Sequence, residues 1–477
     1  MTSLVGLDVG TTGVKALAVS PTGEVLARAE VSYPLSTPQP GWSEQDPDDW
    51  WRAAQAALDA LRRDDVAGIG VAGQMHGLVL LDRERRILRP AILWNDQRTA
   101  AECAEIEERI GLERLVSITG NRALTGFTLP KLLWVRRHEA AVYERVAHVL
   151  LPKDYVRLRL TGELATDVAD ASGTLLLAVP DRRWSREVLD ALEIPPEWLP
   201  PLHESPEAAG NAANGVPVAA GAGDQAAGAL GVGVEGPGPL SVVLGTSGVV
   251  FAALDSFSFD PAGRAHSFCH AVPGRWHAMG VMLSAAGSLR WFRDAIAAGE
   301  DYGALDAEAA HWDPGAEGLR FLPYLAGERT PHADPDARGA FVGLSLRHDR
   351  GALVRAVLEG VAFGLRDSLE LLRGLGVRAD SARVSGGGAR SALWVRMVAS
   401  ILGLPLERTA VEEGAAYGAA LLAGVAGGVF ADPAEAVAAC VRVTETVEPE
   451  PAWASAYEEG YERFRALYPA LRQSRSS

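Results

Sequence analysis

Two acidic residues stand where a carboxylate could act on a phosphoryl group. Asp8 lies near the end of the apolar run Leu4–Val9, and Asp224 follows the apolar run Val218–Ala222 after one glycine. A carboxylate beside a phosphate can hold a hydrated Mg²⁺ ion, and one beside a hydroxyl group can accept its proton. Asp8 is therefore a candidate metal ligand and Asp224 a candidate general base. Taken alone, an Asp placed like Asp224 is more commonly the N-cap of a helix.

Two turns rich in glycine and hydroxyl side chains could bind phosphate groups. They consist of Gly10, Thr11, Thr12 and Gly13, with Lys15 close behind, and of Gly245, Thr246, Ser247 and Gly248. Such turns present backbone N–H groups and hydroxyls to a phosphate. The sequence has no GxxxxGK[ST] motif, and the first turn leads into a strand-like run, so a P-loop is excluded. For either turn alone, a plain β-hairpin is the alternative.

A third glycine segment and a Met-His pair add a possible nucleoside site and a possible acceptor site. The glycine segment consists of Gly386, Gly387 and Gly388, followed by Ser391 at the start of a predicted helix. Without side chains, these glycines would let the backbone approach a base and a ribose closely. Met75 and His76 follow a predicted buried strand, at the end where open α/β sheets bind ligands. An imidazole can bind a sugar hydroxyl, and a thioether can contact its carbon face.

The elements that must position these residues begin with a repeated hairpin pattern. Apolar runs at Leu4–Val9, Val14–Val19 and Val25–Ala29, separated by turns, predict three successive strands. A related arrangement returns at Leu240–Leu244 and Val249–Ala253. This recurrence indicates an internal duplication of the chain.

Helices and further strands between the hairpins give the pattern of an α/β fold. The predicted elements are the strand Val66–Ala72 and helices over Asp48–Arg63, Thr99–Arg109, Gln225–Gly231, Gly351–Leu375, Ser391–Leu402 and Ala415–Ala426. The proline-rich stretch Ile194–Pro217 predicts an irregular connection, and Gly231–Pro239 predicts a boundary. A chain of 477 residues is long enough for two domains meeting at a cleft, here 1–235 and 236–477.

Two GxGxxG matches, Gly68–Gly73 and Gly231–Gly236, do not predict a dinucleotide site. The first lies largely inside a predicted strand, and the second leads into Gly-Pro rather than a helix.

Composition and charge restrict the range of partners. The apolar fraction is 48%, the charged fraction is 22%, and no apolar run approaches the roughly 18 residues that span a bilayer. The N-terminus carries no secretory signal pattern. The formal net charge of −16 disfavours nucleic acid, and no basic stripe offsets it. We expect a cytoplasmic protein with neither nucleic acid nor membrane as partner.

The glycine segments resemble those of the actin-like ATPases, and two further segments narrow the resemblance. Gly126–Trp134 and Gly339–Leu344 are similar to the two signatures of the FGGY carbohydrate kinases. The resemblance implies two actin-like (ribonuclease H-like) α/β domains flanking a central cleft, with ATP and Mg²⁺ bound there. It implies Asp8 as the Mg²⁺ ligand and ATP contacts from Thr11, Thr12, Gly13, Lys15, Gly245, Thr246, Ser247, Gly386, Gly387, Gly388 and Ser391.

Other segments are similar to the family members that phosphorylate D-xylulose. They are Gly73–Gly77, Trp94–Asp96, Gly223–Gly228 and Phe321–His332, although Gln225 stands where many of those members have Asn. The resemblance implies transfer of the ATP γ-phosphoryl group to O5 of D-xylulose, giving D-xylulose 5-phosphate. It implies a sugar site formed by Met75, His76, Trp94, Asn95 and Asp224, with Asp224 as the base.

Several alternatives stay open at this point. Glycerol is disfavoured, because family members that phosphorylate it would carry Arg-Glu in place of Met75-His76. Ribulose or another polyol could be the acceptor instead of D-xylulose. A chaperone-type actin-like ATPase would need a peptide-binding or polymerisation region, and the sequence after residue 430 shows none. The oligomeric state is also open, with a homodimer among the alternatives.

Overall fold

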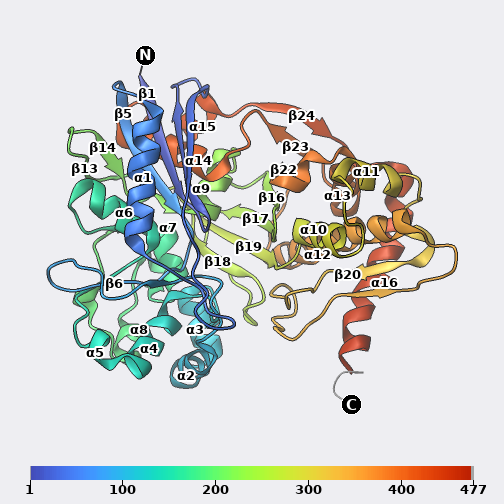
Figure 1. Cartoon of the computed structure of the whole chain (residues 1–477), viewed down its shortest axis with the longest axis horizontal. Coiled ribbons are helices and arrows are strands. Elements are labelled where there is room, and N and C mark those ends of the chain that lie inside the picture. Colours follow the sequence, from blue (N-terminus) through green and yellow to red (C-terminus); the bar gives the residue numbers. More distant parts are fainter. Residues whose placement is uncertain (1, 474–477) are drawn as a thin grey trace.

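Two large β-sheets organise residues 2–473, the part of the chain that the computed structural model describes (Figure 1). The first sheet contains β1 (Ser3–Val9), β2 (Gly13–Val19), β3 (Val25–Ser32), β5 (Val66–Gly73), β13 (Ala208–Asn211), β14 (Pro217–Ala219) and β15 (Ala222–Gly223). The second contains β16 (Leu240–Leu244), β17 (Gly248–Leu254), β18 (His266–Cys269), β19 (Trp276–Met282), β22 (Ala382–Ser385), β23 (Leu406–Thr409) and β24 (Val443–Val447).

The two sheets share an order of six strands, to which the second adds β18 at its edge, and this shared order confirms the predicted duplication. The first runs in the order β13-β14-β5-β1-β2-β3, and the second in the order β24-β23-β22-β16-β17-β19-β18. In each, a hairpin (β1-β2 or β16-β17) continues into a third antiparallel strand. In each, the first hairpin strand also pairs in parallel with the strand on its other side (β5 or β22). The phosphate turns predicted from the sequence are therefore the equivalent hairpin turns of the two sheets.

Helices surround both sheets and complete the mixed α/β class that the sequence predicts. Those in the first half are α1 (Pro47–Leu61), α2 (Ala100–Ile110), α3 (Leu112–Thr119), α4 (Thr128–His138), α5 (Ala140–Tyr143), α6 (Pro152–Thr161), α7 (Val168–Ala171), α8 (Arg186–Leu192) and α9 (Asp224–Gly231). Those in the second half are α10 (Ala286–Ala295), α11 (Tyr302–Ala309), α12 (Arg350–Gly374), α13 (Ala392–Leu402), α14 (Gly414–Ala426), α15 (Pro433–Cys440) and α16 (Ala454–Gln473).

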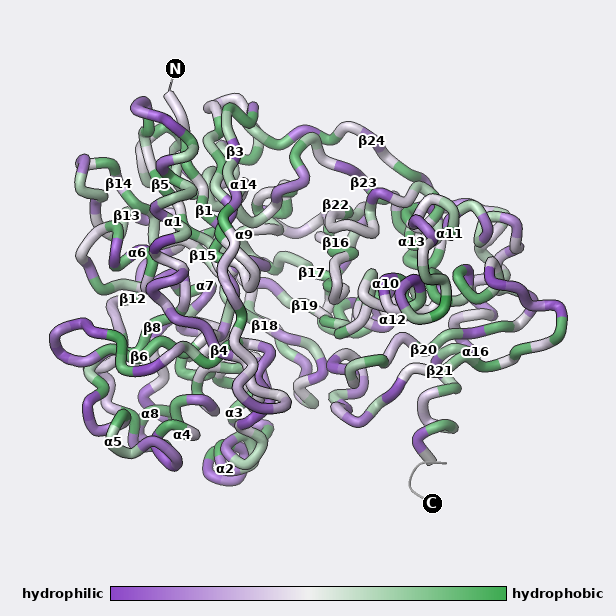
Figure 2. Tube along the Cα trace, in the orientation of Figure 1, coloured by the Kyte–Doolittle hydropathy of each residue, from purple (hydrophilic) through white to green (hydrophobic). Residues whose placement is uncertain are grey.

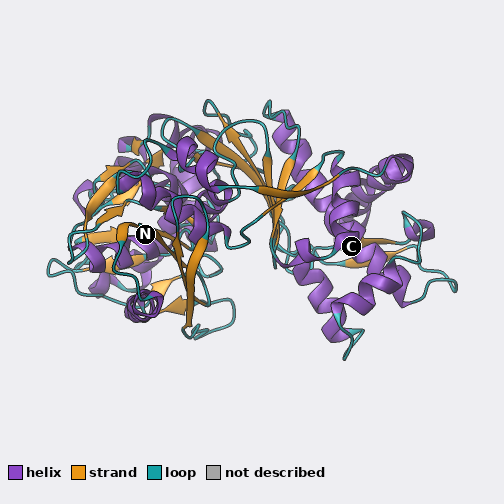
Figure 3. Ribbon diagram, turned by 90° about the horizontal axis from the view of Figure 1, so that it is seen from above, coloured by secondary structure: helices purple, strands orange, loops and turns teal. Residues whose placement is uncertain are grey.

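Short strand pairs join the loops around these layers. They are β4 (Glu44–Gln45) with β7 (Ala91–Ile92), β6 (Val79–Leu81) with β8 (His148–Leu150), β9 (Thr166–Asp167) with β12 (Leu202–His203), β10 (Leu177–Ala178) with β11 (Arg183–Trp184), and β20 (Arg320–Leu322) with β21 (Ala340–Val342). Seen from above, the two halves lie side by side along the long axis (Figure 3). Hydrophobic segments gather in the sheets, and outer loops such as the one beside β6 are hydrophilic (Figure 2).

Helix α14 belongs to the second half of the sequence but packs on the first sheet. It contacts β1, β5 and α9, and Figure 1 shows it in red beside the blue strands. Glycines make this close approach possible: a Cβ atom on Gly6 or Gly70 would lie 1.9–2.0 Å from a backbone oxygen of α14. The helix is apolar on all sides, as expected for a buried helix. The chain therefore passes between the two halves more than once.

One local prediction is wrong, and one apolar run is divided. The apolar run Val218–Ala222 contains parts of two short strands, β14 and β15, which are separated at Gly221, a residue with a φ of 88°. A side chain there would lie 2.0 Å from the carbonyl oxygen of Val71, so the interruption results from contact with β5. The stretch Ile194–Pro217 is not irregular throughout, because β12 and β13 lie in it and Pro217 begins β14. β12 pairs with the distant strand β9, whereas β13 forms a local hairpin with β14.

No helix among the described residues combines the length and the apolar character that a membrane span requires.

Candidate active site

Three parallel strand ends bring the predicted catalytic and acceptor residues to one edge of the first sheet. β5 pairs in parallel with β1 on one side and with β15 on the other. Asp8 lies opposite Ala72 of β5, and Gly223, directly before Asp224, lies opposite Gly73. Met75 and His76 follow the end of β5 itself. Ligands of open α/β sheets bind at such carboxyl ends.

Asp8 and Asp224 form an electrostatically coupled pair of carboxyl groups. Burial raises the pKa of Asp8 to about 6, while the Lys15 ammonium group opposes the rise. Burial, followed by the negative charge of Asp8, raises the pKa of Asp224 to about 7. The Oδ1 atom of Asp8 is buried and accepts no hydrogen bond in the described structure. Both groups therefore lack a neutralising partner strong enough to keep their pKa values at the ordinary level.

Asp224 is not an N-cap, the alternative role that its sequence position allows. Gly223 is the N-cap of α9, and Asp224 is the first residue of the helix. Its carboxyl group instead accepts hydrogen bonds from the backbone and the side chain of Gln225, which partly oppose the rise of its pKa.

The first predicted phosphate turn is held rigidly by side chains from several loops. The amide N–H of Gly10 donates to the carbonyl oxygen of Gly13 over 3.0 Å, which closes the turn. Trp94 Nε1 donates to Thr11 Oγ1 over 3.0 Å, and Gln45 Nε2 donates to the Thr11 carbonyl over 2.7 Å. Thr12 is exposed at the tip. The turn is therefore pre-organised, with its tip open for a ligand.

His76 is held as a neutral imidazole in a left-handed backbone conformation. Its φ is 68°, and its Nδ1 lies 2.7 Å from the carbonyl oxygen of Gly173. Because only a protonated Nδ1 can donate to a carbonyl, Nε2 is an acceptor in the neutral ring. Burial, partly opposed by this hydrogen bond, lowers the pKa of His76 well below its usual value. Met75 is buried beside it, and a Cβ on Gly223 would lie 2.7 Å from Met75 Cγ.

A buried acidic cluster supports the same edge of the sheet. Lys153 Nζ lies 2.6 Å from Asp154, 2.7 Å from Asp167 and 3.8 Å from Asp170. Burial lowers the pKa of Lys153, but the three carboxylates together outweigh it and raise that pKa. Burial raises the pKa of Asp170 well above its usual value, and the charge of Asp224 adds to the rise. Asp170 therefore interacts electrostatically with both Lys153 and the candidate base Asp224.

Trp94 and Asn95 line a separate cavity between the two halves of the chain. This cavity of about 630 Å³ also has Arg122, Glu328 and Arg329 in its wall. Met75, His76 and Asp224 are not part of that wall. The two places are still adjacent, since the charge of Arg329 contributes to the low pKa of His76. The predicted sugar site thus consists of two neighbouring groups of residues. Met75, His76 and Asp224 lie at the strand ends, and Trp94 and Asn95 line the cavity.

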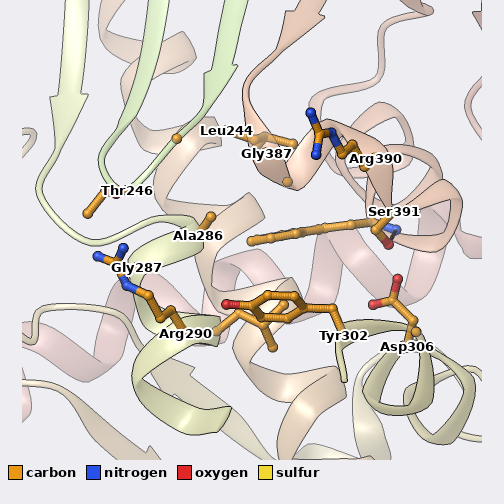
Figure 4. A pocket seen from close by; sticks show the side chains of 15 residues that line it. Leu244, Thr246, Ala286, Gly287, Arg290, Tyr302, Asp306, Gly387, Arg390 and Ser391 are labelled. Carbon is orange, nitrogen blue, oxygen red and sulfur yellow. Dashed lines mark hydrogen bonds between the residues drawn. The ribbon is translucent and has the colours of Figure 1, made fainter. Parts of the chain in front are cut away.

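The second phosphate turn and the triple-glycine segment line one cavity of about 540 Å³ (Figure 4). Of the predicted nucleotide contacts, its wall includes Gly245, Thr246, Gly387, Gly388 and Ser391. Ser247 and Gly386 lie next to this wall in the sequence and are not among its residues. The volume is typical of a site for a small ligand.

Backbone contacts explain why glycines stand in the triple-glycine segment. A Cβ on Gly386 would lie 2.7 Å from the carbonyl group of Leu244, so this glycine seats the segment against the end of β16. Gly387 has nothing within 4 Å of its missing side chain and faces open space. Ser391 is the N-cap of α13 and accepts from the amide of Trp394 over 3.0 Å. The backbone is therefore exposed to a ligand at this helix start.

The donor set at Asp8 fits a hard divalent cation such as Mg²⁺. A buried carboxylate oxygen without a hydrogen-bond partner is what such an ion would satisfy. Mg²⁺ is commonly held by one or two carboxylates together with water and substrate phosphates. No group of three or more His, Cys, Asp or Glu suited to a metal occurs among residues 2–473. The residues fit a metal that arrives with a phosphate ligand.

Comparison with known proteins identifies the family. The N-terminal domain of the FGGY family of carbohydrate kinases matches residues 3–231, and the C-terminal domain matches residues 240–427. The chain belongs to the FGGY family of carbohydrate kinases. As an FGGY kinase it is a phosphotransferase with an alcohol group as acceptor, and its two halves form the actin-like fold. The family assignment excludes the chaperone-type alternative.

Proteins similar to this chain include xylulose kinases and a gluconate kinase. The chain is 45% identical to a xylulose kinase of Escherichia coli (strain K12), over 98% of this chain and 99% of that one. A solved structure of a xyloylose kinase from Brucella ovis is 44% identical over 99% of each chain, with a TM-score of 0.93. A gluconate kinase from Lactobacillus acidophilus is 26% identical over 98% of each chain, also with a TM-score of 0.93. The fold alone therefore does not select the acceptor of an FGGY kinase.

Sequence reasoning gave no role to several residues that the fold brings into these places. Glu328 and Arg329 lie in a segment used for the family resemblance, but only their place in the cavity wall points to a role. Tyr302, Arg290 and Asp306 line the cavity beside the second phosphate turn from α10 and α11. Neither helix carries a motif, so no signal in the sequence could have singled them out.

Proposed function

We propose that this FGGY kinase transfers the γ-phosphoryl group of ATP to O5 of D-xylulose, giving D-xylulose 5-phosphate and ADP. The observation that carries the proposal is the shared strand edge, where Asp224 lies next to the Met75–His76 pair and opposite a phosphate turn. The 45% identity to a xylulose kinase over nearly the whole chain supports D-xylulose as the acceptor.

The proposed chemistry assigns one task to each group of residues. The Asp224 carboxylate accepts the proton of the acceptor hydroxyl while its oxygen forms a bond to the γ-phosphorus. The bond between this phosphorus and the β–γ bridging oxygen breaks, and ADP leaves with the electron pair. Asp8 and the β- and γ-phosphates would hold Mg²⁺, which neutralises charge on the phosphates when bound. His76 Nε2 accepts a hydrogen bond from a sugar hydroxyl.

The nucleotide contacts and the assembly complete the proposal. We assign the phosphates to the two hairpin turns and the nucleoside to the cavity at Gly387, Gly388 and Ser391. We assign residues 1–235 and 236–477 to the two kinase domains, with α14 and α15 packing back on the first. A cytoplasmic location, where ATP is available, and a homodimer stay predictions.

Coupled ADP-release assays over a panel of acceptors test this function. The panel contains D-xylulose, D-ribulose, L-ribulose, gluconate, glycerol and a reaction without acceptor. We expect ADP release to require an acceptor and the kcat/KM for D-xylulose to be highest. If kcat/KM is higher for D-ribulose, L-ribulose or gluconate than for D-xylulose, that compound becomes the proposed acceptor. Equal ADP release with and without every acceptor would overturn it.

A further inference from the structure

Asp306 lines the nucleoside cavity at the end away from the second phosphate turn. In Figure 4, Thr246 lies at one side of the cavity, while Asp306 and Ser391 lie together at the opposite side. Tyr302 precedes Asp306 by one helical turn on α11, so both side chains belong to one face of that helix. A nucleotide with its phosphates at Thr246 would therefore direct its base toward Asp306.

The carboxyl group of Asp306 has unused capacity to accept hydrogen bonds. Its Oδ1 atom is buried and has no hydrogen-bond partner among the described residues. Burial raises the pKa of Asp306, and a hydrogen bond with the Ser391 side chain partly counteracts the rise. A carboxylate can accept about four hydrogen bonds, and leaving it unpaired in a filled cavity is unfavourable. A ligand that fills this cavity should therefore offer a hydrogen-bond donor to the Asp306 carboxylate.

We propose that Asp306 selects adenine by accepting a hydrogen bond from the amino group on C6 of the base. Adenine carries a donor at this position, whereas hypoxanthine carries a carbonyl oxygen, which a carboxylate repels. Ser391 keeps the carboxylate in place from the N-terminus of α13. The inference rests on the proposed use of ATP and names the residue that distinguishes ATP from other purine nucleotides.

The kinetic test compares three triphosphates that differ at C6, of which the third also carries a hydrogen on N1. They are ATP, purine riboside triphosphate, which has hydrogen at C6, and ITP, which has oxygen there. In the wild-type enzyme, kcat/KM with ATP should exceed that with purine riboside triphosphate by about tenfold. Asp306→Ala should bring this ratio close to one. Asp306→Asn should raise the use of ITP relative to ATP, because an amide can donate to the oxygen.

A control on the same helix separates recognition from helix stability. Asp301 is the N-cap of α11, where its side chain accepts from the amide of Ala304, and it lies outside the cavity wall. Asn is as good an N-cap as Asp, so Asp301→Asn should keep the wild-type ratio. Thermal unfolding checks that each variant is folded, and Asp306→Leu, which also lacks an acceptor, replaces Asp306→Ala if the latter is not.

Equilibrium binding of ADP and purine riboside diphosphate separates this inference from the proposed function, since no acceptor takes part. A wild-type preference for ADP that disappears in Asp306→Ala supports the inference even if D-xylulose is not phosphorylated. Equal binding of both diphosphates by the wild-type protein would overturn it. An ADP preference that persists unchanged in Asp306→Ala, or in Asp306→Leu where that variant replaces it, would overturn it as well.

Discussion

The imidazole of His76 can act on the acceptor only through Nε2, because Nδ1 is engaged with Gly173. Burial keeps the ring neutral by lowering its pKa, so this nitrogen accepts a hydrogen bond at physiological pH. A sugar hydroxyl is a suitable donor, and ATP does not need this contact. His76 is therefore expected to affect the acceptor and not the nucleotide.

Replacing His76 tests this assignment. An unpaired hydroxyl in a closed site loses about 1–3 kcal/mol, so His76→Ala should lower kcat/KM for D-xylulose roughly tenfold to a hundredfold. The KM for ATP should change little. Since φ at His76 is 68°, His76→Gly removes the ring without left-handed strain and should lose as much activity. Unchanged D-xylulose constants in both variants would refute the contact.

Asp224 should also lower the stability of the free protein at neutral pH. Its pKa is about 7 in the folded protein, above the 3.8 expected for an unfolded chain, because burial and the charge of Asp8 disfavour ionisation. The folded state thus binds more protons between these values, and the stability falls as pH rises through this interval. The neutral side chain of Asp224→Asn removes this contribution.

Denaturant unfolding of the metal-free protein, without nucleotide, measures the effect. The stability gained by Asp224→Asn over wild type should be small near pH 4 and should increase up to about pH 7, following the pKa shift. Asp59→Asn, at an exposed position of α1, serves as the control and should show no such increase. A difference between Asp224→Asn and wild type that does not vary with pH would contradict the buried, proton-binding carboxyl group.

At the scale of elements, the glycines of β1 and β5 set the distance between the first sheet and α14. Gly68 and Gly70 belong to a GxGxxG match, yet their missing side chains face backbone oxygens of α14. The structure explains the motif by packing, in agreement with the prediction that it is no dinucleotide site. Any side chain at Gly70 would push a buried helix away from the strand that carries Met75 and His76.

Gly70→Ala should therefore destabilise the protein by about 1–3 kcal/mol or more, the usual effect of overpacking a core. A Cβ there would lie 2.0 Å from the backbone oxygen of Ala419, which cannot move independently of its helix. Gly374→Ala is the matched control, because a Cβ at Gly374 meets nothing within 4 Å. The two denaturation midpoints should differ clearly. Equal midpoints for Gly70→Ala and Gly374→Ala would contradict this prediction and would show that α14 can shift away from β5 at little cost in stability.

The elements also show which parts of the fold can be predicted from sequence. The hairpins, α1, α12 and α13 follow local hydrophobic periodicity, α14 is a continuous apolar run, and the ends of all of them agree with prediction within a few residues. β12 was missed because its partner β9 is distant in sequence, whereas β13 forms a local hairpin with β14 that the proline-rich pattern did not predict. The break at Gly221 depends on a contact with Val71, which no local pattern encodes.

The same distinction applies to the candidate site. Asp8, Met75, His76 and Asp224 could be found because each directly follows, or nearly ends, a recognisable strand. Neither the Lys153 cluster nor Asp306 could be found in this way. Their significance comes from tertiary neighbours, such as Asp170 beside Gly223 and Ser391 beside Asp306.

On the scale of the whole molecule, the two substrates are assigned to different halves. The nucleoside cavity belongs to the second sheet and its helices, whereas the candidate base and the acceptor residues belong to the first sheet. Phosphoryl transfer therefore requires both halves to contribute to one reaction site. Closure of the halves on both substrates would also exclude water, whose attack would waste ATP.

The most direct test of this account measures ADP formation and nucleotide affinity together in Asp224→Asn. If Asp224 is the base that joins the two halves in one reaction, D-xylulose-dependent kcat should fall by about 10²–10⁴-fold or more. The Kd for Mg-ATP should stay near the wild-type value, because the nucleotide contacts lie on the hairpin turns and in the other half. Wild-type D-xylulose-dependent turnover in Asp224→Asn would contradict the account.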